Sequence, residues 1–376
     1  MPKNTLLCIA LLSLVACAAP AVHQPVPPTP ATAPARAPVV VPERYVSADD
    51  TRDELDSLAT WPAEDGHTWL VATAKATHTL VVFDADTGKQ LRSVGGKGAG
   101  AGQFLRPNGI AVFGNRLFVA ERDNHRVQVL SLPDFRPMGE FGADGLRAPY
   151  GLWIDETGPG EYDAYVTDSF MEGERHDRLP PFEQLDRRVH RYHLVFGEDG
   201  RFSARDEGTF GDTSEAAALR IVESIAGDPA QKRLLIADEY TSAKAGGRED
   251  AHRPSNLREY TFDGHATGRE LPADTFEAEA EGVALWSCSA DVGYWVAADQ
   301  RYPLTRFLLF DRDTLVPRGA FVGETTAHTD GIALHAATMG TFPSGALFAV
   351  HDDKAVAAFD LGEVARALGL DPACTE

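Results

Sequence analysis

The stretches TLVVFDADTGKQLRSVG, residues 79–95, and FLLFDRDTLVPRGAFVG, residues 307–323, decide the fold because they follow one pattern. Each begins with about five apolar or β-branched residues, the usual length of a strand, passes through an Asp-rich turn and ends in a second short strand. The same pattern recurs in RVQVLSLPDFRPMGEFG, residues 126–142, and in NLREYTFDGHATGRE, residues 256–270. The chain therefore repeats one β-hairpin.

Other short apolar runs, such as Trp69–Thr73 and Gly293–Ala297, predict further strands, and the one helix we expect is Gly362–Leu370. Many short strands separated by turn signals are typical of a sandwich, a barrel or a propeller. The recurring hairpin favours the propeller, because it matches the outer half of a propeller blade. Propeller repeats of about 40 to 50 residues would divide the region from Tyr45 onward into six or seven blades.

Two insertions without strand character, residues 169–188 and 241–255, use part of that length. We therefore predict an all-β fold, a six-bladed β-propeller with four-stranded antiparallel blades whose first strands line the central channel. Residues 102–135, GQFLRPNGIAVFGNRLFVAERDNHRVQVLSLPDF, resemble the NHL type of propeller repeat over about one blade.

The N-terminus carries export signals. Lys3 precedes the apolar run Leu6–Ala16, which is too short to span a membrane and is typical of a signal peptide. Leu14-Val15-Ala16-Cys17 resembles the lipobox of bacterial lipoproteins, which implies cleavage before Cys17, a lipid on its thiol and an outer-membrane anchor. The alternative is an ordinary signal peptide that is cut elsewhere.

We therefore expect a signal peptide at residues 1–16, an extended Pro/Ala-rich tether at residues 17–44 and one propeller domain at residues 45–376. The mature protein would be exported, monomeric and held at the membrane only through its lipid. Cys288 and Cys374 remain, and the sequence leaves open whether they form a disulfide or stay as a buried and a free thiol.

The formal net charge of −21 argues against nucleic acid as a partner, because phosphate backbones need a basic surface. Acidic residues also gather beside strands that would open blades, where like charges in a confined channel repel each other. These positions are Glu223, Asp238-Glu239, Glu279 and Glu281, Asp299-Gln300, Asp330 and Asp352-Asp353. Oxygen ligands in such number suit Ca²⁺. For any one of them the alternative is a turn residue or a solvated charge.

Three segments that hold these residues resemble the calcium-dependent β-propeller phytases. They are VESIAGDPAQKRLLIADEY at residues 222–240, EAEGVALW at residues 279–286 and HTDGIALHAATMGTFPSGALFAVHDD at residues 328–353. The resemblance spans most of the chain, from about Asp56 to about Leu370, and is strongest in the second half.

This resemblance implies a 3-phytase-type phosphoric monoester hydrolase that removes phosphate from myo-inositol hexakisphosphate by attack of a calcium-held water. It implies several calcium ions, held by Asp56, Tyr150, Glu223, Glu239, Glu279, Glu281, Gln300, Asp330 and Asp352. It assigns the phosphate contacts to Lys75 and Arg106, so that Lys75, Arg106 and Glu223 are the residues expected to carry catalysis.

The sequence departs from the family at two places. Ser57 stands where the family has a second acidic residue, and Val166-Thr167-Asp168-Ser169 lacks a lysine of the family. Basic residues of the following insertion, Arg175, His176, Arg178, Arg187 and Arg188, are candidates to replace that lysine. Two alternative functions stay open: an NHL-like propeller that binds a protein, glycan or lactone at the same mouth, and a structural propeller in which calcium only joins blades.

Overall fold

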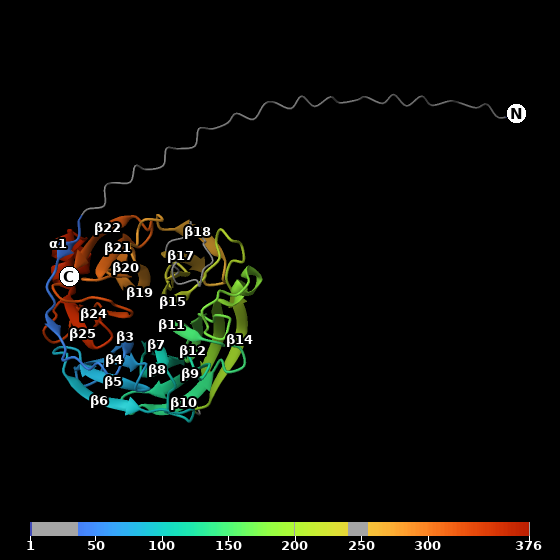
Figure 1. The fold of residues 1–376 in the computed structure, drawn as a ribbon, viewed down its shortest axis with the longest axis horizontal. Coiled ribbons are helices and arrows are strands. Elements are labelled where there is room, and N and C mark those ends of the chain that lie inside the picture. Colours follow the sequence, from blue (N-terminus) through green and yellow to red (C-terminus); the bar gives the residue numbers. More distant parts are fainter. Residues whose placement is uncertain (2–36, 199, 240–254, 376) are drawn as a thin grey trace. The chain divides into compact units, whose positions relative to one another are not determined.

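The computed structural model describes Met1 and residues 37–198, 200–239 and 255–375. The signal peptide, Cys17, most of the tether and the insertion at residues 241–254 lie outside the described residues. The described propeller residues belong to one compact unit, assigned to residues 36–376. In this unit, six sheets are arranged around a central channel (Figure 1). The predicted six-bladed propeller is confirmed.

Each of the first three blades is one antiparallel four-stranded sheet. Blade 1 comprises β3 Leu55–Pro62, β4 Thr68–Ala74, β5 Thr79–Asp84 and β6 Gln90–Gly95. Blade 2 comprises β7 Pro107–Phe113, β8 Arg116–Glu121, β9 Arg126–Ser131 and β10 Arg136–Phe141. Blade 3 comprises β11 Pro149–Gly158, β12 Glu161–Asp168, β13 Val189–Phe196 and β14 Phe202–Phe210, with the short 3₁₀ helix η1 Phe182–Arg187 in its insertion.

The other three blades follow the same plan. Blade 4 comprises β15 Val222–Asp228, β16 Arg233–Asp238, β17 Asn256–Thr261 and β18 Ala266–Glu270. Blade 5 comprises β19 Glu279–Ser287, β20 Gly293–Gln300, β21 Arg306–Asp311 and β22 Pro317–Val322. Blade 6 comprises β23 Ile332–His335, β24 Ala346–His351 and β25 Ala355–Asp360, and its fourth strand is β2 Tyr45–Val46 from the start of the domain.

The core lies between the blades, because each sheet buries both faces against its neighbours. Between blades 1 and 2, for example, Val71 and Leu80 pack with Ile110 and Val119. This explains why the middle strands read as continuous apolar runs. The outermost strands carry the polar surface, and β6 is almost wholly exposed.

The N-terminal segment closes the ring. β2 pairs with β25, while β1, Val39–Val40, adds a parallel fifth strand beside β22. Between them the carboxylate of Glu43 accepts hydrogen bonds from the backbone N–H groups of residues 324, 325 and 326 at 2.9, 3.0 and 2.7 Å. Residues 39–44, which we had expected to be tether, are therefore part of the propeller.

The C-terminus is held by a helix and a disulfide. α1, Leu361–Leu368, overlaps the predicted helix and is capped by Asp360, which accepts a hydrogen bond from the Glu363 N–H. Cys374, in the 3₁₀ helix η2 Pro372–Cys374, forms a disulfide with Cys288. Of the two possibilities that the sequence left open, a disulfide or two separate thiols, the structure has the disulfide. Within the described residues, no helix has both the length and the apolar character needed to cross a bilayer.

Candidate functional site at the channel mouth

Blades 1 to 5 each have a β-bulge at the same place in the first strand. In blade 1, Leu55 pairs with Ala74 and Leu58 with Ala72, so Asp56 and Ser57 together face one residue of β4. In the first strands of blades 2 to 5, two residues at the equivalent position likewise lie opposite a single residue of the second strand. In blade 6, Asp330 and Gly331 precede β23 at the equivalent position. A bulge changes the direction in which side chains point, and here it does so in five of the six blades around the channel.

The first residue of each bulge, together with Asp330 at the equivalent place in blade 6, forms what we call the polar ring. Its members, from blade 1 to blade 6, are Asp56, Asn108, Tyr150, Glu223, Glu281 and Asp330. The second residue is Ser or Gly in every blade. A Cβ on Gly109 would lie 2.1 Å from the Tyr150 carbonyl oxygen, and one on Gly331 would lie 2.3 Å from the Asp56 carbonyl oxygen. A small residue is therefore needed at this second position, because the backbones of neighbouring first strands come into close contact there.

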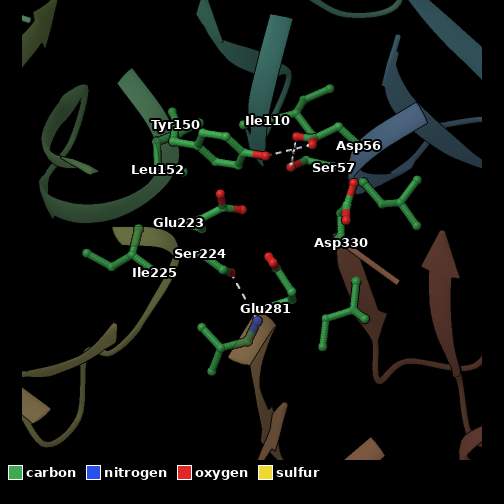
Figure 2. Close-up of a pocket in the computed structure, with 16 residues that line it drawn as sticks. Asp56, Ser57, Ile110, Tyr150, Leu152, Glu223, Ser224, Ile225, Glu281 and Asp330 are labelled. Atoms are coloured by element: carbon green, nitrogen blue, oxygen red, sulfur yellow. Dashed lines mark hydrogen bonds between the residues drawn. The ribbon is translucent and has the colours of Figure 1, made fainter. Parts of the chain in front are cut away.

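Five members of the polar ring line a cavity of about 100 Å³ on the channel axis, the exception being Asn108. An apolar ring also lines it, formed by Leu58, Ile110, Leu152, Ile225, Val283 and Ile332. Figure 2 shows the carboxyl groups of Asp56, Glu223, Glu281 and Asp330 directed toward the common space. The site is thus a small chamber lined by both acidic and apolar side chains.

Asp56 is the most heavily engaged carboxylate of the chamber. It accepts hydrogen bonds from the Tyr150 hydroxyl at 3.0 Å and the Ser57 hydroxyl at 3.1 Å, and the Lys75 ammonium lies 2.9 Å from its Oδ1. Lys75 also contacts Asp330, at 3.2 Å. Burial favours the neutral amine, but the charges of Asp56 and Asp330 outweigh it and hold the pKa of Lys75 above its ordinary value. Lys75 is therefore a fixed positive charge beside the chamber.

Glu223, Glu239 and Glu281 form a group of three buried carboxyls whose oxygens all lie within 4.8 Å of one another. Burial raises the pKa of Glu223 well above its usual range, and the charge of Glu239 adds to this. Burial and the charges of Glu223 and Glu239 do the same to Glu281. Buried carboxyls at this spacing either keep protons or share a compensating cation. The donor set, oxygen only, fits Ca²⁺.

Asp330 belongs to a second group. It accepts a hydrogen bond from the Gln300 amide, and its carboxyl lies within 4.8 Å of ligand atoms of His328 and Asp353. Asp352, which the family resemblance implies as a ligand, instead accepts a hydrogen bond from the Tyr302 hydroxyl and pairs with Lys354 at 3.0 Å. Asp353 is one of the acidic positions that the sequence singled out, whereas His328 was not proposed as a ligand, although it lies inside the segment 328–353.

Several acidic residues at strand ends have a structural role. Asp238 accepts hydrogen bonds from the backbone N–H groups of Arg220 and Ile221, which lead into β15. Asp168 and Asp299 accept equivalent pairs of bonds in blades 3 and 5. The next residue in blades 4 and 5, Glu239 or Gln300, is the one that reaches a chamber group. Asp238 and Asp299, the first residues of the pairs Asp238-Glu239 and Asp299-Gln300, are therefore structural turn residues, which is the alternative that the sequence left open for them.

The remaining sequence candidates lie away from the chamber. Arg106 precedes β7 at the rim, 3.6 Å from the Glu54 carboxylate, and Glu279 holds the same position before the bulge of blade 5. Among the insertion residues, Arg188 is fully buried and donates to the carbonyl oxygens of Asp168 and Phe170. Arg175 and Arg178 pair within the insertion, with Asp177 and Glu172. None of these contacts brings Arg175, Arg178 or Arg188 to the chamber, where one of them was expected to replace the lysine that the family has near Ser169.

Asn108 is the member of the polar ring that sequence reasoning missed. It is fully buried, and neither polar atom of its amide has a hydrogen-bond partner among the described residues. Its equivalence to Asp56 and Glu223 depends on the bulge register, which alternation along one strand does not reveal.

One family match agrees with the fold. A family model for the NHL repeat matches residues 104–130, which run through most of the first three strands of blade 2. Among solved structures, hydrazine synthase of Kuenenia stuttgartiensis superposes with a TM-score of 0.45 and 12% sequence identity, over 80% of this chain and 75% of that chain. That likeness is too distant to carry an argument about function. No curated protein matches the sequence. The chain is therefore a six-bladed β-propeller that contains an NHL repeat.

Proposed function

We propose that this protein is a calcium-dependent phosphomonoesterase that hydrolyses phytate, myo-inositol hexakisphosphate, to lower inositol phosphates and phosphate. The observation that carries the proposal is that two opposite features lie together at the ring where the six blades begin. Three buried carboxyls suited to a hard cation lie on blades 4 and 5, and the buried ammonium of Lys75 lies on blade 1. Cations and Lys75 together would let an acidic protein accept a polyanion.

The residues proposed to hold calcium are Glu223, Glu239 and Glu281, with Asp330, Gln300, Asp56 and Tyr150 around the same chamber. When bound, calcium would neutralise phosphate oxygens and supply an activated water. The resemblance also implies Asp352 and Glu279 as calcium ligands, and these two residues would bind calcium outside the chamber.

The chain's own residues would position the substrate. A cavity of about 100 Å³ has room for a few waters, at about 30 Å³ each, so the inositol ring would stay at the mouth while one phosphate approaches the polar ring. Lys75 would bind that phosphate and stabilise the charge that develops in the transition state. Because burial raises the pKa of Tyr150, its hydroxyl stays protonated and continues to orient Asp56. Arg106 at the rim would contact a phosphate there.

Glu223→Gln tests the proposal, with Glu64→Gln on the exposed surface as the matched control. We expect the first variant to bind less calcium in isothermal titration and to lose at least about a hundredfold in phosphate release, since it removes a charge from the cation site. The control should equal the native protein. Equal calcium binding by both variants would reject the assigned site.

We also propose that the protein is exported and works as a monomer held at the outer membrane by a lipid on Cys17. The signal and lipobox carry this part of the proposal.

The NHL match in blade 2 and the small size of the chamber favour a second candidate, a binding propeller whose mouth holds a protein or glycan. Calcium binding without phosphate release from any inositol phosphate would favour this candidate over the first.

A further inference from the structure

The turn after the second strand carries a histidine in both blade 1 and blade 2. His78 follows the end of β4 by four residues, and His125 follows the end of β8 by four residues. Both have left-handed backbone conformations, with φ of 60° and 57°. Each imidazole reaches the next blade: Nδ1 of His78 lies 3.0 Å from the backbone nitrogen of Arg106, and Nδ1 of His125 lies 2.6 Å from the carbonyl oxygen of Arg147.

These two contacts require opposite protonation states at Nδ1. A backbone N–H can only donate, so Nδ1 of His78 must be the acceptor and must carry no proton. A carbonyl can only accept, so Nδ1 of His125 must carry a proton. A second proton on His78 breaks its contact, whereas a second proton on His125 leaves its contact intact.

The His78 contact supports a rim residue in a costly conformation. Arg106 has a φ of 51°, in the left-handed region that side chains other than Asn and Gly rarely adopt. Its N–H bond to His78 and its carbonyl, which accepts from the Arg122 N–H at 3.1 Å, hold the backbone on both sides. The guanidinium, 3.6 Å from Glu54, is directed from this backbone at the rim.

We propose that His78 is a positioning residue that holds Arg106 ready for a phosphate group only while the imidazole is neutral. This inference rests on the proposed function, which makes Arg106 a phosphate contact. The result is a mouth that captures phosphate groups less well in acid.

The charges around His78 agree in direction with the geometry. Burial lowers the pKa of His78, and the positive charges of Lys97 and Arg106 lower it further, against the opposing effect of Asp123. The neutral form therefore predominates down to pH values below the ordinary histidine value of about 6.5. The contact is lost as the pH falls through the lowered value.

The test uses myo-inositol hexasulfate, whose sulfate groups keep a constant charge between pH 5 and 7.5 and are not phosphate esters. Binding to the calcium-loaded protein is measured by titration calorimetry across that range. His78→Asn keeps an acceptor and suits the left-handed backbone, yet does not titrate. His125→Asn is the matched control, and His78→Ala removes the acceptor.

We expect native protein and His125→Asn to lose about five- to tenfold more affinity than His78→Asn on going from pH 7.5 to pH 5, the size of one lost hydrogen bond. His78→Ala should bind weakly at both pH values. Parallel pH profiles of native protein and His78→Asn would overturn the inference. Native protein that fails to bind hexasulfate at any pH would overturn the proposed function as well.

Nitrogen NMR of the imidazoles provides a readout that does not depend on ligand. Nδ1 of His78 should be unprotonated at pH 7.5 and Nδ1 of His125 protonated. The reverse pattern for His78 would overturn the positioning role even if the protein hydrolyses phytate.

Discussion

The ammonium group of Lys75 lies 2.9 Å from Oδ1 of Asp56, in a pair that is almost wholly buried. Lys75 comes directly after β4 and Asp56 lies in the bulge of β3, so the contact is local to blade 1. The same ammonium lies 3.2 Å from Asp330, which precedes the first strand of blade 6. One cation therefore connects the first and last blades where the ring closes.

Lys75→Met should affect both activity and stability. It leaves two buried carboxyls without their cation, so we expect the free energy of unfolding in chelator to fall by about 3 kcal/mol. Phosphate release should fall at least about a hundredfold, as for loss of a group that stabilises transition-state charge. Lys89→Met, on the exposed surface, is the control. Urea unfolding and phosphate assays measure the two effects, and native values for Lys75→Met would contradict both.

The stability of the calcium-free protein should fall as the pH rises from about 5 to 8. Glu223 and Glu281 have raised pKa values in the fold, so the native state binds protons more tightly than the unfolded chain. The contribution of these two groups to stability is fully present below the ordinary Glu pKa of about 4.5 and is lost as the pH rises toward the folded pKa values. Urea unfolding in chelator measures this slope. The double variant Glu223→Gln/Glu281→Gln should flatten it, and an unchanged slope would assign the effect to other groups.

Cys288→Ser combined with Cys374→Ser should destabilise the domain by about 3 kcal/mol, because the bond joins residues 86 positions apart. Reducing agent should lower the melting temperature of the native protein and leave the double variant unchanged. Equal melting temperatures of the oxidised native protein and the double variant would show that the link contributes nothing.

Cys17→Ser should move the protein from the membrane fraction to the soluble fraction, since the proposed lipid needs the thiol. Cell fractionation with an antibody against the propeller measures this. A variant that remains with the membranes would show that another feature anchors the chain.

The fold was predictable because the repeated hairpin reports directly on local structure: an apolar run, an Asp-rich turn and a second run, as in residues 79–95 and 307–323. The ring closure was not, because β2 is two residues long and lies beside a Pro-rich segment. Its pairing with β25 connects residues more than 300 positions apart, and no local pattern announces that contact.

The site was predictable in part. Glu223, Glu281 and Asp330 stand out as acidic residues in apolar surroundings, and the structure brings them into one chamber with Lys75. Asn108, at the same ring position, is not acidic and so gave no signal. Regular alternation along β19 would point Glu279 and Glu281 to one spot, but the bulge between Ala280 and Val283 breaks that alternation.

Phosphate release from myo-inositol hexakisphosphate by the purified propeller, with calcium and with excess chelator, tests the central claim most directly. Three buried carboxyls within 4.8 Å of one another are proposed to work only around a cation, so release should occur with calcium and stop in chelator. It should return when calcium is restored, with the far-UV circular dichroism of the propeller retained throughout. Undiminished release in chelator, or no release by folded, calcium-loaded protein, would contradict the account.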